Sequence, residues 1–171
     1  MLLRDPSNPN EARSTMTPST SEGRKPLAIV GLDAEPSHKA PSYVIACTID
    51  SRISRFSLQD DSLGKEEASW QAPKSKQPGG CWSISIHPNS DLAQFATSGI
   101  GSEILILSSA IETFGQEKLK INGRGDFSTC QYSPDGRILA IVSNTGQLAL
   151  HDADTGDLVQ LITGMSIPCL S

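Results

Sequence analysis

Short runs of alternating hydrophobic and polar residues cover most of the chain, and residues that favour turns separate these runs. The clearest example is the segment 127–164. Within it, the β-rich run 137–143, RILAIVS, is followed by the turn Asn144-Thr-Gly146 and by a second run at 147–151. Runs of this length that end at glycine-containing turns predict β-strands rather than helices. We therefore expect residues 127–164 to form one sheet of four short antiparallel strands.

The same pattern occurs earlier in the chain, and a proline turn marks the two later repeats. Tyr132-Ser-Pro-Asp-Gly136 is predicted to be a tight turn, because proline fixes φ at its first corner and glycine tolerates its last position. His87-Pro-Asn-Ser90 occupies the same place, with its proline 46 residues earlier. Four-stranded repeats at about this spacing are typical of the blades of a WD-type β-propeller. The predicted units are 26–72, 81–121 and 127–163.

The expected fold class is therefore all-β, with WD40-type β-propeller blades that are antiparallel four-stranded sheets. In such repeats the turn between the third and fourth strands carries a Trp-Asp pair. Here that position reads Phe56-Ser57, Leu107-Ser108 and His151-Asp152, so only the last repeat retains the aspartate. The repeats have diverged, but their period is retained.

Composition narrows the class of protein. The chain has 171 residues and a formal net charge of -5, whereas binding to nucleic acid normally requires a basic face. It contains no apolar run long enough to span a membrane, and its first residues lack the apolar segment of a secretory signal. The separated cysteines Cys47, Cys81, Cys130 and Cys169 predict buried thiols in a reducing compartment. We therefore expect an intracellular protein that contacts neither membrane nor nucleic acid directly.

Residues 1–25 differ from the rest of the chain, because Ser, Thr, Pro and charged residues dominate them. A segment with so little to bury does not offset the entropy lost on ordering. We expect these residues to be a flexible tail. The propeller segment is expected to cover residues 26–171, with the start of a fourth blade at 164–171.

Residues suited to catalysis or to ligand binding are sparse. The histidines His38, His87 and His151 fall in unrelated predicted loops and turns, so they predict neither a metal site nor a catalytic pair. Gly123-Arg-Gly125 lacks the helix and the lysine of a phosphate-binding loop, and we interpret it as a link between blades. The sequence thus predicts no catalytic residue, no metal site and no cofactor.

Binding to other proteins is the activity that remains. The residues that open the innermost strands of a propeller lie near one rim, and here they include Trp82 and Phe127. Aromatic side chains at a surface are effective anchors for a partner, so Trp82 and Phe127 form the candidate partner-binding rim. The alternative is that both side chains pack between blades.

Four stretches of the sequence carry a more specific resemblance: CWSISIHPNSD at 81–91, ATSGIGSEILILS at 96–108, INGRGDFSTCQYSPDGRILA at 121–140 and TGDLVQLITGMSIPCLS at 155–171. They resemble the family of WD-repeat subunits of the superkiller (Ski) complex, known in animals as the WD-repeat protein 61 family. The resemblance implies a closed seven-bladed propeller that holds a helicase and a tetratricopeptide-repeat protein together for 3′-to-5′ mRNA decay in the cytoplasm. It also implies nuclear roles in meiotic recombination or transcription elongation.

The chain departs from this family in length, since it accounts for about three of the seven expected blades. We expect either a fragment of a larger gene product or a form whose exposed sheet faces are covered by a partner. Two other interpretations stay open. One is a WD-repeat adaptor of a different complex, such as a substrate receptor of a ubiquitin ligase, and the other is a non-functional truncated gene model.

Overall fold

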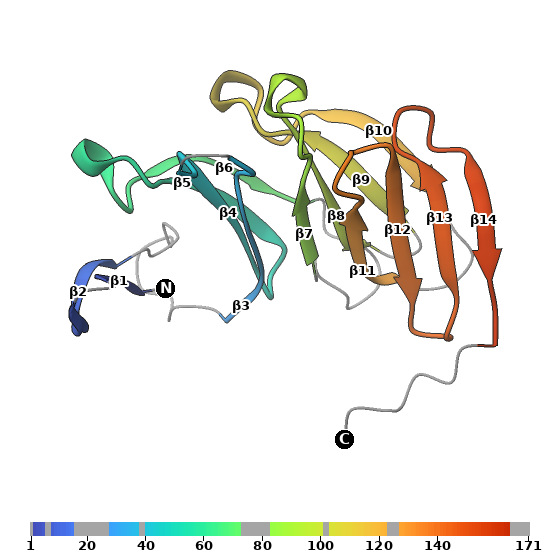
Figure 1. Ribbon diagram of the computed structural model, residues 1–171, viewed down its shortest axis with the longest axis horizontal. Helices are drawn as coiled ribbons and strands as arrows, with labels where there is room; N and C mark the ends of the chain where they lie inside the picture. Colours follow the sequence, from blue (N-terminus) through green and yellow to red (C-terminus); the bar gives the residue numbers. More distant parts are fainter. Residues whose placement is uncertain are drawn as a thin grey trace.

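The structure is a computed structural model that describes residues 2–5, 8–15, 28–37, 40–72, 83–100, 103–122 and 127–164. In these residues the protein is all-β, with three antiparallel four-stranded sheets and three short 3-10 helices at turns. This arrangement confirms the predicted fold class and is consistent with propeller-like blades (Figure 1).

Each sheet is a simple meander in which consecutive strands are hydrogen-bonded neighbours. The first sheet contains β3 (Ile29–Ala34), β4 (Tyr43–Thr48), β5 (Arg52–Ser57) and β6 (Glu66–Gln71). The second contains β7 (Ser83–Ile86), β8 (Gln94–Ile100), β9 (Glu103–Ser108) and β10 (Glu117–Asn122). The third contains β11 (Phe127–Tyr132), β12 (Ile138–Ser143), β13 (Leu148–Asp152) and β14 (Leu158–Ile162). The 3-10 helices η1 (Asp60–Ser62), η2 (Ser90–Leu92) and η3 (Ile111–Thr113) lie in the connecting loops.

The three sheets pack face to face, with the second between the first and the third (Figure 1). Strand β9 shows how the sequence produces this arrangement. Its side chains alternate between the two faces of the sheet. Leu105 and Leu107 belong to the core shared with the first sheet, whereas Ile104 and Ile106 belong to the core shared with the third. A strand that is buried on both faces needs an apolar run on both, and residues 104–107 provide it.

The innermost strands β3, β7 and β11 hold the sheets together through equivalent side chains. The Asp33 carboxylate accepts a hydrogen bond from the Ile86 backbone N–H, with Oδ2 and the nitrogen 2.7 Å apart. The Ser85 hydroxyl accepts a bond from the Tyr132 backbone N–H over 3.0 Å. Asp33 and Ser85 occupy the same place in consecutive repeats, so the repeat in the sequence is also a repeat of contacts between sheets.

The three sheets make the same hydrogen bond at the position where the sequence analysis expects a Trp-Asp pair, although only the third sheet has an aspartate there. At the end of each third strand, a side-chain oxygen accepts a hydrogen bond from the backbone N–H two residues later. The three pairs are Ser57 Oγ with Gln59 N at 3.2 Å, Ser108 Oγ with Ala110 N at 3.3 Å, and Asp152 Oδ1 with Asp154 N at 3.0 Å. A serine hydroxyl is thus a sufficient acceptor for this turn.

The structure differs from the sequence prediction near the N-terminus. Residues 1–25 are expected to be a flexible tail, but they include the paired strands β1 (Leu2–Asp5) and β2 (Asn8–Thr15). These strands form a sheet of their own and supply each other with backbone hydrogen bonds, which composition does not reveal. Residues 16–25, and residues 165–171 of the expected fourth blade, lie outside the described residues.

Two sequence observations can be located in the fold. Cys47 and Cys130 are buried thiols, in agreement with the prediction, whereas Cys81 and Cys169 lie outside the described residues. In the part of the chain that the structure describes, no helix is both long enough and apolar enough to cross a membrane.

Candidate partner-binding site

The aromatic rim predicted from the sequence is only partly described. Trp82 lies outside the described residues. Phe127 is the first residue of β11, where its Cα pairs with that of Ser143 in β12, and its side chain is outside the described part of the structure. Both positions remain candidates from the sequence.

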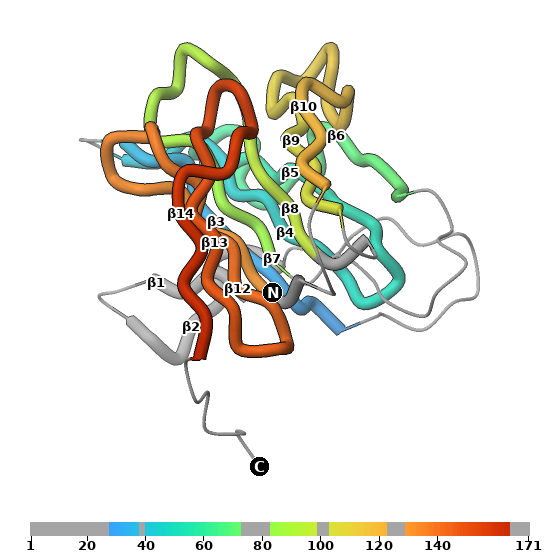
Figure 2. Tube along the Cα trace, turned by 90° about the vertical axis from the view of Figure 1, so that its right-hand side faces the viewer, coloured from blue at the N-terminus to red at the C-terminus, as the bar shows by residue number. Residues whose placement is uncertain are grey.

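A different surface forms at the opposite end of the innermost strands. The loops that follow β3, β7 and β11 lie at the same end of the molecule as the loops that follow β5, β9 and β13. Figures 1 and 2 show this end uppermost, with the loops after β7, β9 and β13 projecting from it. We refer to this end of the molecule as the loop end.

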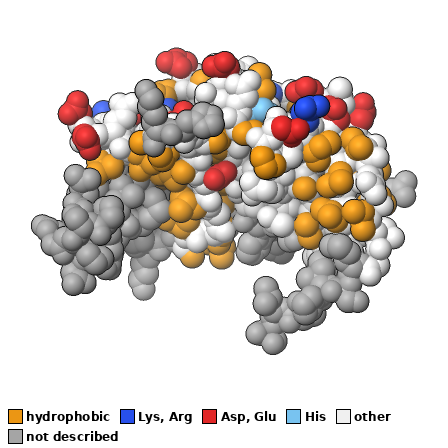
Figure 3. All heavy atoms as spheres, in the orientation of Figure 1, with side chains coloured by type: hydrophobic (Ala, Val, Ile, Leu, Met, Phe, Trp, Pro, Cys, Tyr) orange, Lys and Arg blue, Asp and Glu red, His pale blue; other side chains and the backbone are white. Residues whose placement is uncertain are grey.

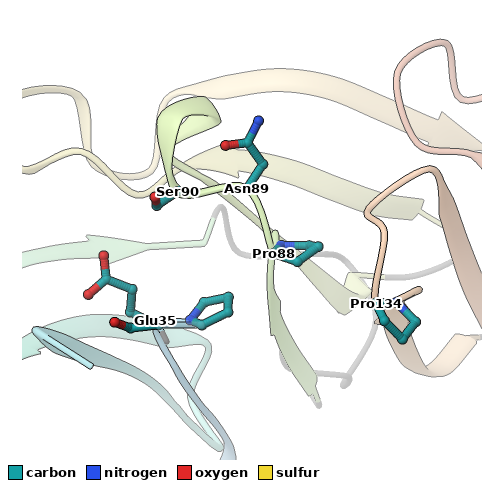
Figure 4. A pocket seen from close by; sticks show the side chains of 7 residues that line it. Glu35, Pro88, Asn89, Ser90 and Pro134 are labelled. Carbon is teal, nitrogen blue, oxygen red and sulfur yellow. The ribbon is translucent and has the colours of Figure 1, made fainter. Parts of the chain in front are cut away.

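A hollow of about 660 Å³ lies at the loop end and spans all three sheets. The loop after β3 contributes Glu35, Pro36 and Ser37, the loop after β7 contributes Pro88, Asn89 and Ser90, and the loop after β11 contributes Pro134. In Figure 4 the rings of Pro88 and Pro134 lie near each other, and Glu35 lies across from them. The proline turns that mark the repeat in the sequence are therefore brought together in space.

Local hydrogen bonds fix the shape of two of these loops. In the turn that carries Pro134, the Gly136 N–H donates to the Ser133 carbonyl over 2.9 Å. The Asp135 carboxylate accepts from the Ser133 hydroxyl over 2.6 Å. Next to Pro88, the Asn89 side chain accepts from the Asp91 N–H over 3.1 Å and caps η2. The loops are thus held in place by contacts within the chain itself.

His87 connects the second and third sheets beneath the hollow. Its ring is buried, and Nδ1 accepts a hydrogen bond from the Asn89 N–H over 3.0 Å. Because Nδ1 is an acceptor, Nε2 of the neutral ring carries the proton and donates to the Gly136 carbonyl, 3.1 Å away. The edge of the ring also meets Tyr132 at a centroid distance of 4.8 Å. His87 therefore positions the loops that carry Pro88 and Pro134.

Glu35 supplies the charge in the wall of the hollow. Its Oε2 atom accepts from the Ser42 N–H over 2.7 Å and also from the Ser42 hydroxyl. These bonds hold the half-buried carboxylate at the end of the loop, and Figure 4 shows it directed toward the side of the hollow formed by Ser90. Because both of these bonds use Oε2, the Oε1 atom is in a position to accept a hydrogen bond from a ligand.

Acidic side chains gather along the loop end, as the upper edge of Figure 3 shows. Two of them are stabilised as carboxylates. Hydrogen bonds from the Ser133 hydroxyl and the Arg137 backbone N–H lower the pKa of Asp135. Backbone N–H groups of Thr155 and Asp154 lower the pKa of Asp152. Both groups are therefore negatively charged at neutral pH.

The described histidines serve the fold. His87 makes the contacts given above, and His151 Nδ1 lies 2.9 Å from the Gly156 carbonyl within its own turn, while His38 lies outside the described residues. Among the residues that the structure describes, no three His, Cys, Asp or Glu side chains are grouped so that they would hold a metal ion. What this arrangement offers chemically is a recess with apolar proline rings and polar groups in its walls and with one carboxylate acceptor.

The hollow does not follow from the sequence patterns alone, although the sequence contains a signal for it. Pro88 and Pro134 mark the repeat, and equivalent residues of adjacent blades lie side by side. A proline that follows each innermost strand therefore predicts a shared proline-lined surface. This surface exists only when the repeats stand side by side, so no single repeat indicates it. Glu35 has no counterpart in the other repeats, and its place in the wall follows only from the packing of the sheets.

Comparison with known proteins gives one partial similarity. No family model matches the chain. A region of 98 residues is 29% identical to the meiotic recombination protein rec14 of Schizosaccharomyces pombe. The matched region covers 57% of this chain and 31% of that protein. The chain thus spans about a third of the length of the curated relative that it matches.

Proposed function

We propose that this protein is a non-catalytic scaffold of the WD-repeat type that binds other proteins and holds them in one assembly. The observation that carries the proposal is the hollow at the loop end, where equivalent loops of three sheets form one preformed recess. Repeated sheets that present their loops on a common surface are typical of protein-binding repeat architectures. Because the loops are fixed by the fold, little ordering entropy opposes the binding of a partner.

The finer assignment concerns the assembly that the scaffold serves. The similarity to the meiotic recombination protein rec14 supports a nuclear role in meiotic recombination. The resemblance of residues 81–91 and 121–140 to WD-repeat subunits of the Ski complex supports a second role in cytoplasmic 3′-to-5′ mRNA decay. In that role the proposed partners are a helicase and a tetratricopeptide-repeat protein. We propose that the scaffold contacts these proteins and neither nucleic acid nor membrane.

Co-purification tests the assignment. The full chain carries an affinity tag in the cells that express it, and proteins bound to it are compared with those bound to the tag alone. Recovery of a helicase together with a tetratricopeptide-repeat protein is the expected result for the Ski role, and recovery of recombination proteins from meiotic cells is expected for the meiotic role. Recovery of cullin-ligase subunits instead would show an adaptor of another complex.

Two variants separate the predicted rim from the hollow. Trp82→Ala removes an aromatic side chain of the rim, whereas Ser90→Arg places a large charged side chain at an exposed residue of the hollow. Circular dichroism verifies that both variants remain folded. Loss of partners from Ser90→Arg alone is expected if the hollow is the docking surface. Full retention of partners by Ser90→Arg would contradict this use of the hollow.

A further inference from the structure

We propose that the hollow at the loop end binds an extended, basic segment of a partner protein, with a Lys or Arg side chain directed at Glu35. The inference rests on the proposed scaffold function, because it specifies the kind of chain that the scaffold holds. Four features carry it: the volume of the hollow, the chemistry of its walls, the charge around it and the way the nearby cations are engaged.

The volume and walls of the hollow suit a short piece of extended chain. Its volume of about 660 Å³ lies within the range of sites that hold small ligands or a few side chains. Three proline rings supply apolar contact area that is rigid before binding, since proline has a fixed φ. Asn89 and Ser90 supply polar groups between these rings. Aliphatic stems of Lys and Arg pack well on such apolar surfaces while their charged ends reach polar groups.

The charge at the hollow is negative on the sides that the described loops form. Glu35 lies in the wall itself, and Asp91 and Asp135 directly follow the lining residues Ser90 and Pro134 in the chain. Glu35 uses Oε2 for its bonds to Ser42, so its Oε1 atom has the geometry of an acceptor for an incoming cation. A carboxylate that is partly shielded from water attracts a guanidinium or ammonium group more strongly than an exposed one does.

The described loops of the loop end as a whole also carry a negative net charge. The described loops that follow the first and third strand of each sheet carry eight acidic residues and two basic residues. The acidic residues are Glu35, Asp60, Asp61, Asp91, Glu112, Asp135, Asp154 and Asp157, and the basic residues are Lys65 and Arg137. Such an excess attracts basic segments and speeds their association.

Two described cations of this region, Arg137 and Lys118, are engaged with groups of the protein. Arg137 Nε lies 3.2 Å from Asp135 Oδ2, and Lys118 Nζ donates to the Leu92 carbonyl. The field of the loop end also disfavours other occupants. A second copy of this chain would present the same acidic end, and a nucleic acid would present phosphates, so like charges would face each other in both cases. A basic protein segment is the occupant that the charges fit.

The experiment uses the full chain and fluorescent peptides in an anisotropy titration. The probe is a peptide of repeated Lys-Leu-Pro triplets, and its matched control is the peptide with each Lys replaced by Glu. The Lys peptide is expected to bind, with an affinity that falls as salt is raised above about 0.15 M. Binding of the Glu peptide with equal affinity would overturn the proposal, and so would an absence of binding by the Lys peptide.

Two charge-neutralising variants locate the binding. Glu35→Gln keeps an amide oxygen as the acceptor for Ser42 but removes the charge, and we expect it to weaken the Lys peptide roughly threefold to tenfold. Glu112→Gln removes an exposed charge of η3, which lies at the same end but does not line the hollow, and we expect it to change the affinity by less than about twofold. Equal weakening by both variants would show diffuse attraction by the acidic end and would overturn the proposal.

The outcome for this inference is separable from that for the scaffold function. If partners still co-purify with Glu35→Gln while the Lys peptide shows no dependence on Glu35, the scaffold function stands and the basic-segment inference fails. If the wild-type chain recovers no partner at all, the scaffold function fails irrespective of the peptide result. Unfolding midpoints of both variants, compared with the wild type, verify that the measured changes come from binding.

Discussion

At the scale of single residues, the contacts between sheets depend on polar side chains at equivalent positions. Asp33 and Ser85 both accept a backbone N–H of the next innermost strand, and His87 bridges to the Gly136 carbonyl. Burying such a polar group without a hydrogen-bond partner costs free energy. Each one therefore favours the distance and angle at which the next sheet supplies its partner. Two predictions test this view.

Asp33→Asn is expected to stabilise the protein at neutral pH. Burial raises the pKa of the Asp33 carboxyl, and the bonds from the Ile86 and Ala34 N–H groups only partly oppose it. Because the folded state binds this proton more tightly than the unfolded state does, stability is lost as pH rises from the unfolded pKa of about 3.9 through the raised folded value. Asparagine does not titrate, and its single oxygen can accept from the Ile86 N–H, whereas the exposed bond from the Ala34 N–H is lost.

Thermal unfolding at about pH 4 and about pH 7 measures this effect. The gain from Asp33→Asn should be larger at pH 7 and shrink toward pH 4. Glu112→Gln, a change at an exposed turn residue, serves as the control for removal of one negative charge from the loop end. A gain that grows toward acid pH would contradict the assigned direction of the pKa shift.

Gly136→Ala is expected to lower the free energy of unfolding by about 2–4 kcal/mol. Gly136 has a φ of 75°, and a Cβ atom there would lie 2.5 Å from His87 Cε1. Gly164→Ala is the matched control, because Gly164 has a φ of 81° but a Cβ atom added there would meet no other atom within 4 Å. It should cost only the backbone term of about 1–2 kcal/mol. Equal losses in chemical denaturation would show that the His87 contact contributes nothing.

At the scale of the element, the sequence predicts the strands well where side chains alternate and less well at their ends. The run 137–143 corresponds to β12, since turns lie on both sides of it. Strand β8 begins only at Gln94, because Asn89 caps η2 and residues 90–92 form that 3-10 helix. Strand β6 begins at Glu66, whose Cα pairs with that of Phe56 in β5, and the Arg52 guanidinium lies 3.1 Å from the Glu66 carboxylate. Such pairings depend on register, which local composition does not contain.

The outer strands of the sheets differ in their protection against association, and this difference gives a prediction. Strand β10 carries Lys118 and Lys120 at its exposed edge, whereas β14 has no charged residue and exposes Leu158 and Val159 by 54% and 60%. Hydrophobic side chains over β12 to β14 also form a visible patch in Figure 3. An uncharged, apolar edge strand is a site of edge-to-edge pairing.

Val159→Lys is therefore expected to reduce self-association at high protein concentration, with a change in the free energy of unfolding below about 0.5 kcal/mol. Static light scattering over a concentration series measures the effect. The reverse change on the second sheet, Lys120→Val, removes an edge charge from β10 and should increase scattering. The same scattering for Val159→Lys and the wild type would show that β14 is not the associating edge.

At the scale of the whole molecule, the position of the second sheet decides both stability and the site. One face of this sheet contributes to the core shared with the first sheet, and the other face contributes to the core shared with the third. The second sheet is therefore buried on both faces. The same packing brings Pro88 beside Pro134 and places Glu35 opposite them. The repeat period in the sequence is enough to predict the sheets. The hollow needs the angle and spacing between sheets, which follow from contacts such as Asp33 with Ile86.

Hydrogen exchange should show that the second sheet is more protected than the outer edge of the third. Amides of β9 are expected to exchange most slowly, because the strand is central in its sheet and both of its faces are buried. Amides of β14 should exchange fastest among the strands of the three sheets, since β14 is an edge strand with exposed side chains.

A core substitution tests the contact between the second and third sheets. The Ile106 side chain is 1% exposed and packs in the core that these two sheets share. Ile106→Ala should therefore lower the free energy of unfolding by about 2–5 kcal/mol.

The set of strands whose amides exchange faster in Ile106→Ala is a sharper test of whether the sheets unfold together. If the second and third sheets unfold as one unit, Ile106→Ala should speed exchange in β11 and β12 as well as in β9. Leu158→Ala, at an exposed side chain of the third sheet, should leave the exchange of β9 unchanged. Faster exchange confined to the second sheet would show that the sheets open independently. In that case the hollow would be lost whenever one sheet opens, and a partner would have to bind against the entropy of ordering it.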